Sequence, residues 1–367
     1  MHIIHIVGAR PNFMKAAPVM RAINDMKGIE QTLIHTGQHY DANMSDIFFS
    51  QLGMKRPDIN LGTGSGSHAF QTGQIMIKLE KIFSELKPDM VFVYGDVNST
   101  LSASLVCAKQ HIKLAHVEAG LRSFDRTMPE EINRIVTDSL ADVLFTPSQD
   151  GNENLIREGV SPGKIHMVGN VMIDTLIRLL PEAKLLWPQE SGKYQIQRKG
   201  YVMVTLHRPS NVDDPDMLGR IIYALNNISR KIPVLFPVHP RTRKRIAGIP
   251  GIRISDTIKL IEPIGYIEFL VLQSEASSVI TDSGGIQEET TFLGVPCLTV
   301  RENTERPVTV TSGTNILIGR DMEKLESEVD NIITGNVRKG SIPQLWDGFS
   351  GKRIAETICL SLNNFLE

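Results

Sequence analysis

Short apolar segments alternate with helical patterns along this chain, and the same alternation starts again near residue 201. In the first half each segment is rich in β-branched or apolar residues and ends in Gly, Asp or Ser, which is typical of strands. These segments cover residues 2–8, 32–37, 89–96, 114–120 and 143–148. Helical patterns lie between them, at residues 15–26, 71–86 and 99–111. Because each strand is followed by a crossover helix, the order predicts a parallel sheet with helices on its faces.

The second run of strands predicts a second unit of the same class. Its segments cover residues 201–209, 233–240, 259–265, 277–285 and 295–301. A chain of 367 residues also exceeds the usual size of one hydrophobic core. We therefore expect an α/β protein with two similar units, residues 1–170 and 171–351, with the boundary before the polar stretch at 187–200.

Charge and cysteine content exclude several partners and compartments. Lys and Arg total 39 against 41 acidic residues, so a net charge of −2 provides no basic field for nucleic acid or an anionic membrane. Three cysteines are far apart and odd in number, which favours a reducing compartment. The N-terminal residues resemble no signal peptide, and no stretch approaches membrane-spanning length. The sequence predicts a cytoplasmic, soluble protein without nucleic-acid or membrane partners.

Charged residues follow the predicted strands. Ligands of open parallel sheets bind beyond the carboxyl ends of the strands, so this edge is where a site is expected. The candidates in the first half are Arg10, Lys15, Asp96, His116, Glu118, Arg122, Glu130, Glu131 and Arg134. Those in the second half are His207, Arg208, His239, Arg241, Arg301 and Arg306. Taken singly, each has a simpler interpretation, because strand-end histidines are often structural and acids at a helix start complement the helix dipole. No Walker, HExxH or clustered Cys/His motif indicates a metal or nucleotide-triphosphate site.

The segment VITDSGGIQEETTFLG, residues 279–294, predicts an anion site at the start of a helix. Ser283, Gly284 and Gly285 fall where a strand passes into a helix, so free backbone amides and the positive end of the helix dipole meet there. Glycine also lets a diphosphate approach the backbone closely. Glu288 or Glu289, about one turn further on, would suit a ribose diol better than a phosphate. A glycine-rich structural turn is the alternative.

Seven motifs together resemble the non-hydrolysing UDP-N-acetylglucosamine 2-epimerases, in order and over nearly the whole chain. They are GARPNFMKAAPV, TGQHYD, GDVNST, HVEAGLRS, MPEEINR, TDSGGIQEE and TERP. The resemblance implies the GT-B fold, in which two Rossmann-like domains face each other across a cleft that closes on the substrate. It also implies a homodimer, a last helix at about 352–367 that packs back on the first domain, and a UDP-sugar substrate. Members of this family interconvert UDP-GlcNAc and UDP-ManNAc through a 2-acetamidoglucal, with no metal or redox cofactor.

The resemblance further implies roles for individual residues. The catalytic residues match Asp96, Glu118, Glu130 and His207, although which acid removes the C2 proton stays open. The substrate-binding residues match Arg10, Lys15, Arg134, His239, Phe269, Ser283, Gly284, Gly285, Glu289 and Arg306. Among these, Ser283 to Gly285 correspond to the phosphate turn, Glu289 to the ribose contact and Phe269 to the neighbour of uracil.

Other functions remain open at this point. A hydrolysing 2-epimerase that releases ManNAc and UDP would begin with the same elimination, and a GT-B glycosyltransferase would share the fold and the phosphate turn. Related enzymes act on diacetamido-uronic UDP-sugars, but they tend to carry Lys where Glu288 stands. A catalytically silent UDP-sugar sensor is the non-enzyme alternative. Phe70 stands where related sequences lead us to expect a polar residue, which bears on loop contacts and regulation only.

Overall fold

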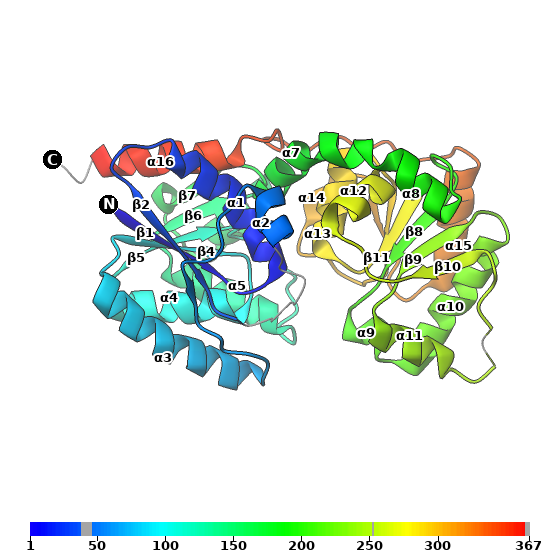
Figure 1. Cartoon of the computed structure of the whole chain (residues 1–367), viewed down its shortest axis with the longest axis horizontal. Helices are drawn as coiled ribbons and strands as arrows, with labels where there is room; N and C mark the ends of the chain where they lie inside the picture. The colour runs from blue at the N-terminus through cyan, green and yellow to red at the C-terminus, as the bar shows by residue number, and fades with distance from the viewer. Residues whose placement is uncertain (38–45, 252, 364–367) are drawn as a thin grey trace. The chain divides into compact units, whose positions relative to one another are not determined.

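The computed structural model describes residues 1–37, 46–251 and 253–363 (Figure 1). Part of the TGQHYD motif and the last residues of the predicted C-terminal helix lie outside this described part. The chain divides into two compact units within a single helix, between Thr175 and Leu176. The first unit contains residues 1–175 and the segment that begins at Gln344, and the second runs from Leu176 to Pro343.

The first unit is built on a seven-stranded sheet in which every strand pair is parallel. Its strand order is β3-β2-β1-β4-β5-β6-β7. The strands are β1 His2–Val7, β2 Glu30–His35, β3 Ile59–Asn60, β4 Met90–Tyr94, β5 Lys113–Val117, β6 Val143–Thr146 and β7 Ile165–Met167. The sequence pattern did not predict β3 and β7, because strands of two or three residues are too short to show alternation.

Helices cover both faces of this sheet. In Figure 1, α1 and α16 lie on one side of the strands, and α3, α4 and α5 lie on the other. The helices of the unit are α1 Arg10–Asn24, α2 Asp46–Leu52, α3 His68–Leu86, α4 Asn98–Gln110, α5 Pro129–Leu140, α6 Gln149–Arg157, the short 3-10 helix Pro162–Lys164 and α16 Ser350–Asn363. The helix α7 Val171–Leu185 begins in this unit and continues into the second. One core cluster packs Ile75, Leu79 and Phe83 of α3 with buried side chains of β1 and β4. Their spacing of four residues places these three side chains on one helical face.

The second unit repeats this architecture with a six-stranded sheet of parallel pairs, in the order β10-β9-β8-β11-β12-β13. Its strands are β8 Val202–Thr205, β9 Val234–Pro237, β10 Ile258–Ile261, β11 Ser278–Thr281, β12 Cys297–Thr299 and β13 Asn315–Leu317. Its helices are α8 Trp187–Tyr194, α9 Pro209–Val212, α10 Pro215–Ser229, α11 Pro240–Ala247, α12 Tyr266–Glu275, α13 Gly284–Leu293, α14 Pro307–Thr311 and α15 Met322–Ile333. The polar stretch at 187–200 therefore begins as a helix. The prediction of two parallel α/β units is confirmed.

The strand order reverses direction at one place in each sheet. This switch point lies between β1 and β4 in the first sheet and between β8 and β11 in the second. Because the loops after these strands lead to helices on opposite faces, the sheet edge opens there and can admit a ligand. The candidate residues should therefore gather after β1, β4, β8 and β11.

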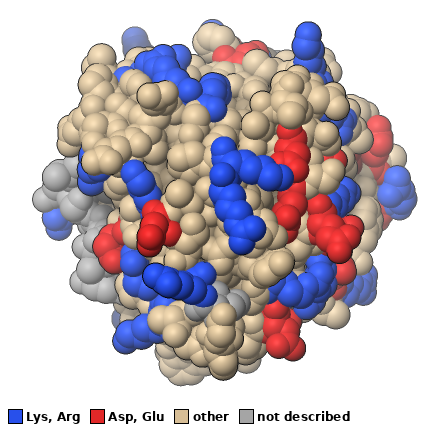
Figure 2. Space-filling model, turned by 90° about the vertical axis from the view of Figure 1, so that its right-hand side faces the viewer, with Lys and Arg blue, Asp and Glu red and all other residues tan. Residues whose placement is uncertain are grey.

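The charges on the surface and the hydropathy of the helices agree with what the composition predicts. Basic and acidic side chains are interspersed on the face shown in Figure 2. No helix in the described part of the chain combines the length and the apolar character needed to cross a bilayer.

Candidate active site

The turn from β1 into α1 is tied to the end of β4 by the buried Asn12. Its side-chain oxygen accepts hydrogen bonds from the backbone N–H groups of Gly8 and Ala9 at 3.1 and 3.0 Å. Its amide nitrogen donates to the carbonyl oxygen of Tyr94 at 2.9 Å. Asn12 thus joins the two strands that flank the switch point, and Arg10 starts α1 beside it. The sequence contained Asn12 within a quoted motif but gave no signal of this role.

Lys15 and Glu118 form a buried ion pair at the same edge. Lys15 Nζ lies against Glu118 Oε2, and both side chains are almost fully enclosed. Gly95 makes this approach possible: a Cβ at that position would lie 2.7 Å from Lys15 Nζ and 3.1 Å from Glu118 Oε2. Glu118 itself has a φ of 74°, in the left-handed region that non-glycine residues rarely adopt. Strained backbone of this kind is concentrated at functional sites, so the geometry supports Glu118 as a site residue.

Asp96 follows β4, directly after Gly95, and is paired with Arg134. Arg134 Nη1 donates to Asp96 Oδ2 at 2.5 Å, and the Asp96 side chain keeps 27% of its surface exposed. The amide of Asn133 donates to the Asp96 backbone carbonyl at 2.8 Å. Glu130, in the first turn of α5, is half-buried. The structure therefore brings Asp96, Glu118, Lys15 and Arg134 to one edge of the first sheet.

A buried charge network supports this edge from within the unit. His116 directs Nδ1 to Asp138 at 2.6 Å and Nε2 to the Gly95 carbonyl at 2.9 Å. The His116 ring therefore lies between two hydrogen-bond acceptors. Arg122 adds an ion pair to Asp138 at 2.7 Å. Burial raises the pKa of Asp138, but His116 and Arg122 outweigh it and hold that pKa below its usual range. Sequence reasoning placed His116 and Arg122 at the strand edge but missed Asp138.

In the second unit, Asp282 orients His207. Asp282 follows β11, is fully buried, and accepts the His207 and Arg208 backbone N–H groups at 3.1 and 2.9 Å. Its Oδ1 also lies 2.9 Å from His207 Nδ1. Burial raises the pKa of Asp282, but the bonds from His207 and Asn211 lower that pKa by more, so the carboxylate is favoured. His207 Nδ1 therefore donates to Asp282, while the His207 side chain as a whole is 60% exposed.

The start of α13 brings together Ser283, Gly284, Gly285 and Arg306. An ideal Cβ on Gly284 would lie only 2.3 Å from Arg306 Nη1, so glycine leaves the space in which the guanidinium reaches the helix start. Arg306 is itself held by Glu288 Oε1 at 2.8 Å and Glu305 Oε1 at 2.5 Å. Backbone amides, the helix dipole and a cation thus meet at one place, which is the chemistry of an anion site.

Glu289 lies one turn further along α13 in a buried setting. It accepts hydrogen bonds from the Tyr266 hydroxyl at 2.9 Å and from the Gln273 amide at 2.6 Å. Burial raises the pKa of Glu289 to about 7 despite these two donors. Each carboxylate oxygen has a second lone pair, so the two bonds leave acceptor capacity for a diol. Phe269 lies on α12 with Tyr266 and is half-buried.

His239 caps α11 in a way that fixes its tautomer. Its Nδ1 accepts the backbone N–H of Arg241 at 3.2 Å, so the neutral ring carries its proton on Nε2. The residue is exposed, and this N–H is a donor suited to a phosphate or hydroxyl oxygen.

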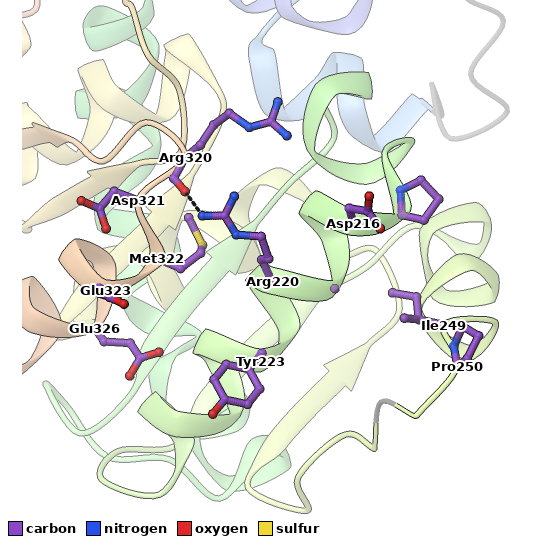
Figure 3. Close-up of a pocket in the computed structure, with 12 residues that line it drawn as sticks. Asp216, Arg220, Tyr223, Ile249, Pro250, Arg320, Asp321, Met322, Glu323 and Glu326 are labelled. Carbon is purple, nitrogen blue, oxygen red and sulfur yellow. Dashed lines mark hydrogen bonds between the residues drawn. The ribbon is translucent and has the colours of Figure 1, made fainter.

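A separate hollow of about 1010 Å³ lies in the second unit, along α10 and the start of α15 (Figure 3). Arg220 donates to the Arg320 carbonyl at 2.7 Å within it, and acidic residues of α15 form part of its wall. None of the predicted site residues lines this hollow. Among the residues described, no group of three or more His, Cys, Asp or Glu side chains is arranged to hold a metal ion.

Comparison with known proteins decides the family. The sequence profile described as UDP-N-acetylglucosamine 2-epimerase matches residues 21–359. This chain belongs to that family. A UDP-N-acetylglucosamine 2-epimerase of Methanococcus maripaludis is 44% identical over 96% of this chain and 97% of its own length. The resemblance of the motifs to UDP-N-acetylglucosamine 2-epimerases is thereby confirmed.

Members of the family differ in substrate. The UDP-2,3-diacetamido-2,3-dideoxy-D-glucuronate 2-epimerase of Pseudomonas aeruginosa is also 44% identical, over 88% of this chain and 90% of its own. Among solved structures, the UDP-GlcNAc 2-epimerase of Methanocaldococcus jannaschii, in complex with UDP-GlcNAc and UDP, superposes with a TM-score of 0.89. It shares 41% identity, covering 98% of this chain and all of the other. The likeness confirms the predicted GT-B class of this epimerase-family member.

Proposed function

We propose that this chain interconverts UDP-GlcNAc and UDP-ManNAc without releasing free sugar. The observation that carries the proposal is the placement of two carboxylates, Asp96 after β4 and Glu118 after β5, each held by a cation at the edge where α/β sheets bind ligands. Membership of the family, and the UDP-GlcNAc and UDP bound to the Methanocaldococcus relative, support the substrate.

The reaction needs a base that removes the C2 proton and groups that stabilise UDP as it leaves. A carboxylate removes the proton from C2 of the sugar, the C1–O bond breaks, and its electron pair leaves with UDP. The product is a 2-acetamidoglucal with a double bond between C1 and C2. When a proton returns to the other face of C2, a diphosphate oxygen attacks C1 and the epimer forms. Acids on both sides of C2 are therefore required, and Asp96, Glu118 and Glu130 supply the candidates.

The second unit supplies the groups that stabilise the diphosphate. The backbone amides of Gly284 and Gly285, at the start of α13, and the guanidinium of Arg306 balance the charge that develops on UDP. His239 Nε2–H is a further donor, and the family resemblance assigns His239, Arg10 and Lys15 to the surroundings of the diphosphate or the sugar. Glu289 accepts the ribose hydroxyls, and Phe269 contacts uracil. His207, oriented by Asp282, transfers a proton or donates to the leaving group.

One NMR experiment tests this proposal against its rivals. The purified chain is incubated with UDP-GlcNAc in heavy water, and proton spectra are followed over time. We expect UDP-ManNAc that carries deuterium at C2, with little free ManNAc. Free ManNAc as the main product would identify a hydrolysing epimerase, and an unchanged spectrum would point to a transferase or a sensor. Turnover of the diacetamido-uronic UDP-sugar in a parallel reaction, with none of UDP-GlcNAc, would reassign the substrate.

A further inference from the structure

Glu131, next to the predicted acid Glu130, is a buried carboxylate with an unusual number of donors. It accepts the backbone N–H and the hydroxyl of Ser123, both at 3.0 Å, and the backbone N–H of Phe124 at 2.9 Å. Its Oε2 also accepts from Arg134 Nε at 3.0 Å and Nη2 at 2.7 Å. Five donors thus converge on one side chain that is 1% exposed.

These contacts keep Glu131 ionised within the fold. Burial raises the pKa of Glu131, but the Ser123 backbone and Arg134 outweigh it, so that pKa lies below its usual value. An anion in this position balances the charge of Arg134, which would otherwise be buried with a less complete set of acceptors. Glu131 also fixes the guanidinium plane, because two of its N–H groups are directed to one oxygen.

Arg134 carries this fixed geometry to Asp96. Its Nη1 reaches Asp96 Oδ2 at 2.5 Å while Nε and Nη2 bond to Glu131. The side chains of Glu131 and Arg134 are 1% and 2% exposed, whereas that of Asp96 is 27% exposed. Exposure therefore increases from the buried Glu131 and Arg134 to Asp96, whose carboxylate solvent and substrate can reach. The fork of Arg134 engages Glu131 and fixes the guanidinium, so the single hydrogen bond from Nη1 sets the position of Asp96 Oδ2.

We propose that Glu131 and Arg134 are positioning residues that hold Asp96 in the orientation needed for proton transfer at C2. Arg134 then acts through Asp96, and substrate contact by Arg134 is not required. The inference rests on the proposed function, since it assigns Asp96 to the reacting carbon. Small errors in the position of a catalytic group can lower a rate by about 100-fold.

A double-mutant cycle tests the proposal with the full chain and UDP-GlcNAc. Glu131→Gln keeps the side-chain volume and should lower kcat by about 10- to 100-fold while KM stays within about threefold. Asp96→Asn should lower kcat by about 10²- to 10⁴-fold. If Glu131 acts through Asp96, adding Glu131→Gln to Asp96→Asn should change the remaining rate by less than about twofold. Deuterium incorporation at C2, followed by NMR to long times, measures all four proteins.

Controls separate positioning from general damage. Asp347→Asn removes another carboxylate paired with an arginine, Arg353, from the first unit and should leave kcat unchanged. Thermal unfolding checks that each variant folds. If Glu131→Gln does not fold, Arg134→Lys takes its place, because it retains the charge but loses the fork, and the same non-additivity is expected.

The outcomes distinguish this inference from the proposed function. A loss of kcat from Glu131→Gln that is equal with and without the Asp96→Asn substitution would overturn the inference, as would no loss in either case. Normal turnover by Asp96→Asn would show that Asp96 takes no part in the reaction. A wild-type protein that does not epimerise UDP-GlcNAc would overturn the proposed function itself.

Discussion

Asp96 and Glu118 follow neighbouring strands, yet their backbones are held differently. Asp96 follows a glycine turn and is steered by a side chain of α5, whereas Glu118 has a left-handed backbone and contacts Lys15 of α1. Each arrangement fixes a carboxylate in a different way, which is expected where two acids have separate tasks.

Removing either carboxylate should therefore abolish most of the turnover while the fold survives. We expect Asp96→Asn and Glu118→Gln each to lower kcat by about 10²- to 10⁴-fold, because amides cannot accept the C2 proton. The measurement is the initial rate of UDP-ManNAc formation by NMR. Glu85→Gln, at an exposed position on α3, is the matched control and should retain full activity. Near-normal turnover by either site variant would show that its role is wrong.

Glu289 makes stability depend on pH in a direction that can be stated. Its pKa is about 7 in the fold against 4.5 in the unfolded chain, so folding favours the neutral acid. The resulting contribution of Glu289 to the free energy of unfolding is fully present below about pH 4.5 and is lost as pH rises through about 7.

Glu289→Gln should therefore become more stable relative to wild type as pH rises. A shift of this size corresponds to about 3 kcal/mol in the difference between the two unfolding free energies from about pH 4 to about pH 8.5. Urea denaturation of both proteins at several pH values measures it, with Glu323→Gln as an exposed control in the same unit. A difference that stays constant with pH would contradict the raised pKa. The same variant should also bind UDP more weakly if Glu289 contacts ribose.

The start of α13 shows how far the sequence alone predicted an element of the site. The strand, the Ser-Gly-Gly turn and the helix were all predicted from local patterns, because apolar runs and glycine positions reflect local backbone preferences. The cation beside the turn was not predictable in this way, since Arg306 is distant in sequence and reaches Gly284 only through tertiary packing. The supporting roles of Glu131, Asp138, Asp282 and Asn12 were missed for the same reason.

Adjacent glycines of this turn should respond differently to alanine. Gly284→Ala would place a Cβ 2.3 Å from Arg306 Nη1, so both unfolding temperature and UDP affinity should fall. A Cβ on Gly285 meets no atom within 4 Å, so Gly285→Ala should keep the unfolding temperature. Its affinity for UDP should fall, because the added methyl group hinders the approach of the diphosphate to the backbone. Calorimetric titration with UDP and thermal unfolding measure the two effects. Gly192→Ala, in open space on α8, is the control for both.

Equal affinities for UDP in wild type, Gly284→Ala and Gly285→Ala would show that the phosphates do not bind at this helix start. A fall in unfolding temperature for Gly285→Ala as large as that for Gly284→Ala would contradict the packing difference.

At the scale of the whole molecule, the chain leaves the first unit along α7 and returns to it near Gln344. The return is closed by α16, whose residue Gly351 approaches the backbone of Pro18 in α1 so closely that a Cβ would lie 2.6 Å from the Pro18 carbonyl oxygen. Asp174 of α7 accepts the backbone N–H groups of Ser350 and Gly351 at 3.1 and 2.7 Å. Periodicity predicted two units, but only the family resemblance suggested that the last helix belongs with the first unit, because strand and helix patterns carry no information on long-range pairing.

The packing of α16 can be tested with substitutions at one buried and one exposed position of the helix. Ile354 is fully buried and Leu360 is 68% exposed. We expect Ile354→Ala to destabilise the protein by about 2–5 kcal/mol, since it leaves a cavity in the core, and Leu360→Ala to change stability by less than about 0.5 kcal/mol. Chemical denaturation measures both, and a substrate-free protein avoids stabilisation by bound UDP. Because α16 packs on α1, which carries Lys15, the destabilised variant should also lose turnover at a lower temperature than wild type. Similar stabilities for the two variants would mean that α16 does not pack on the first unit through this face.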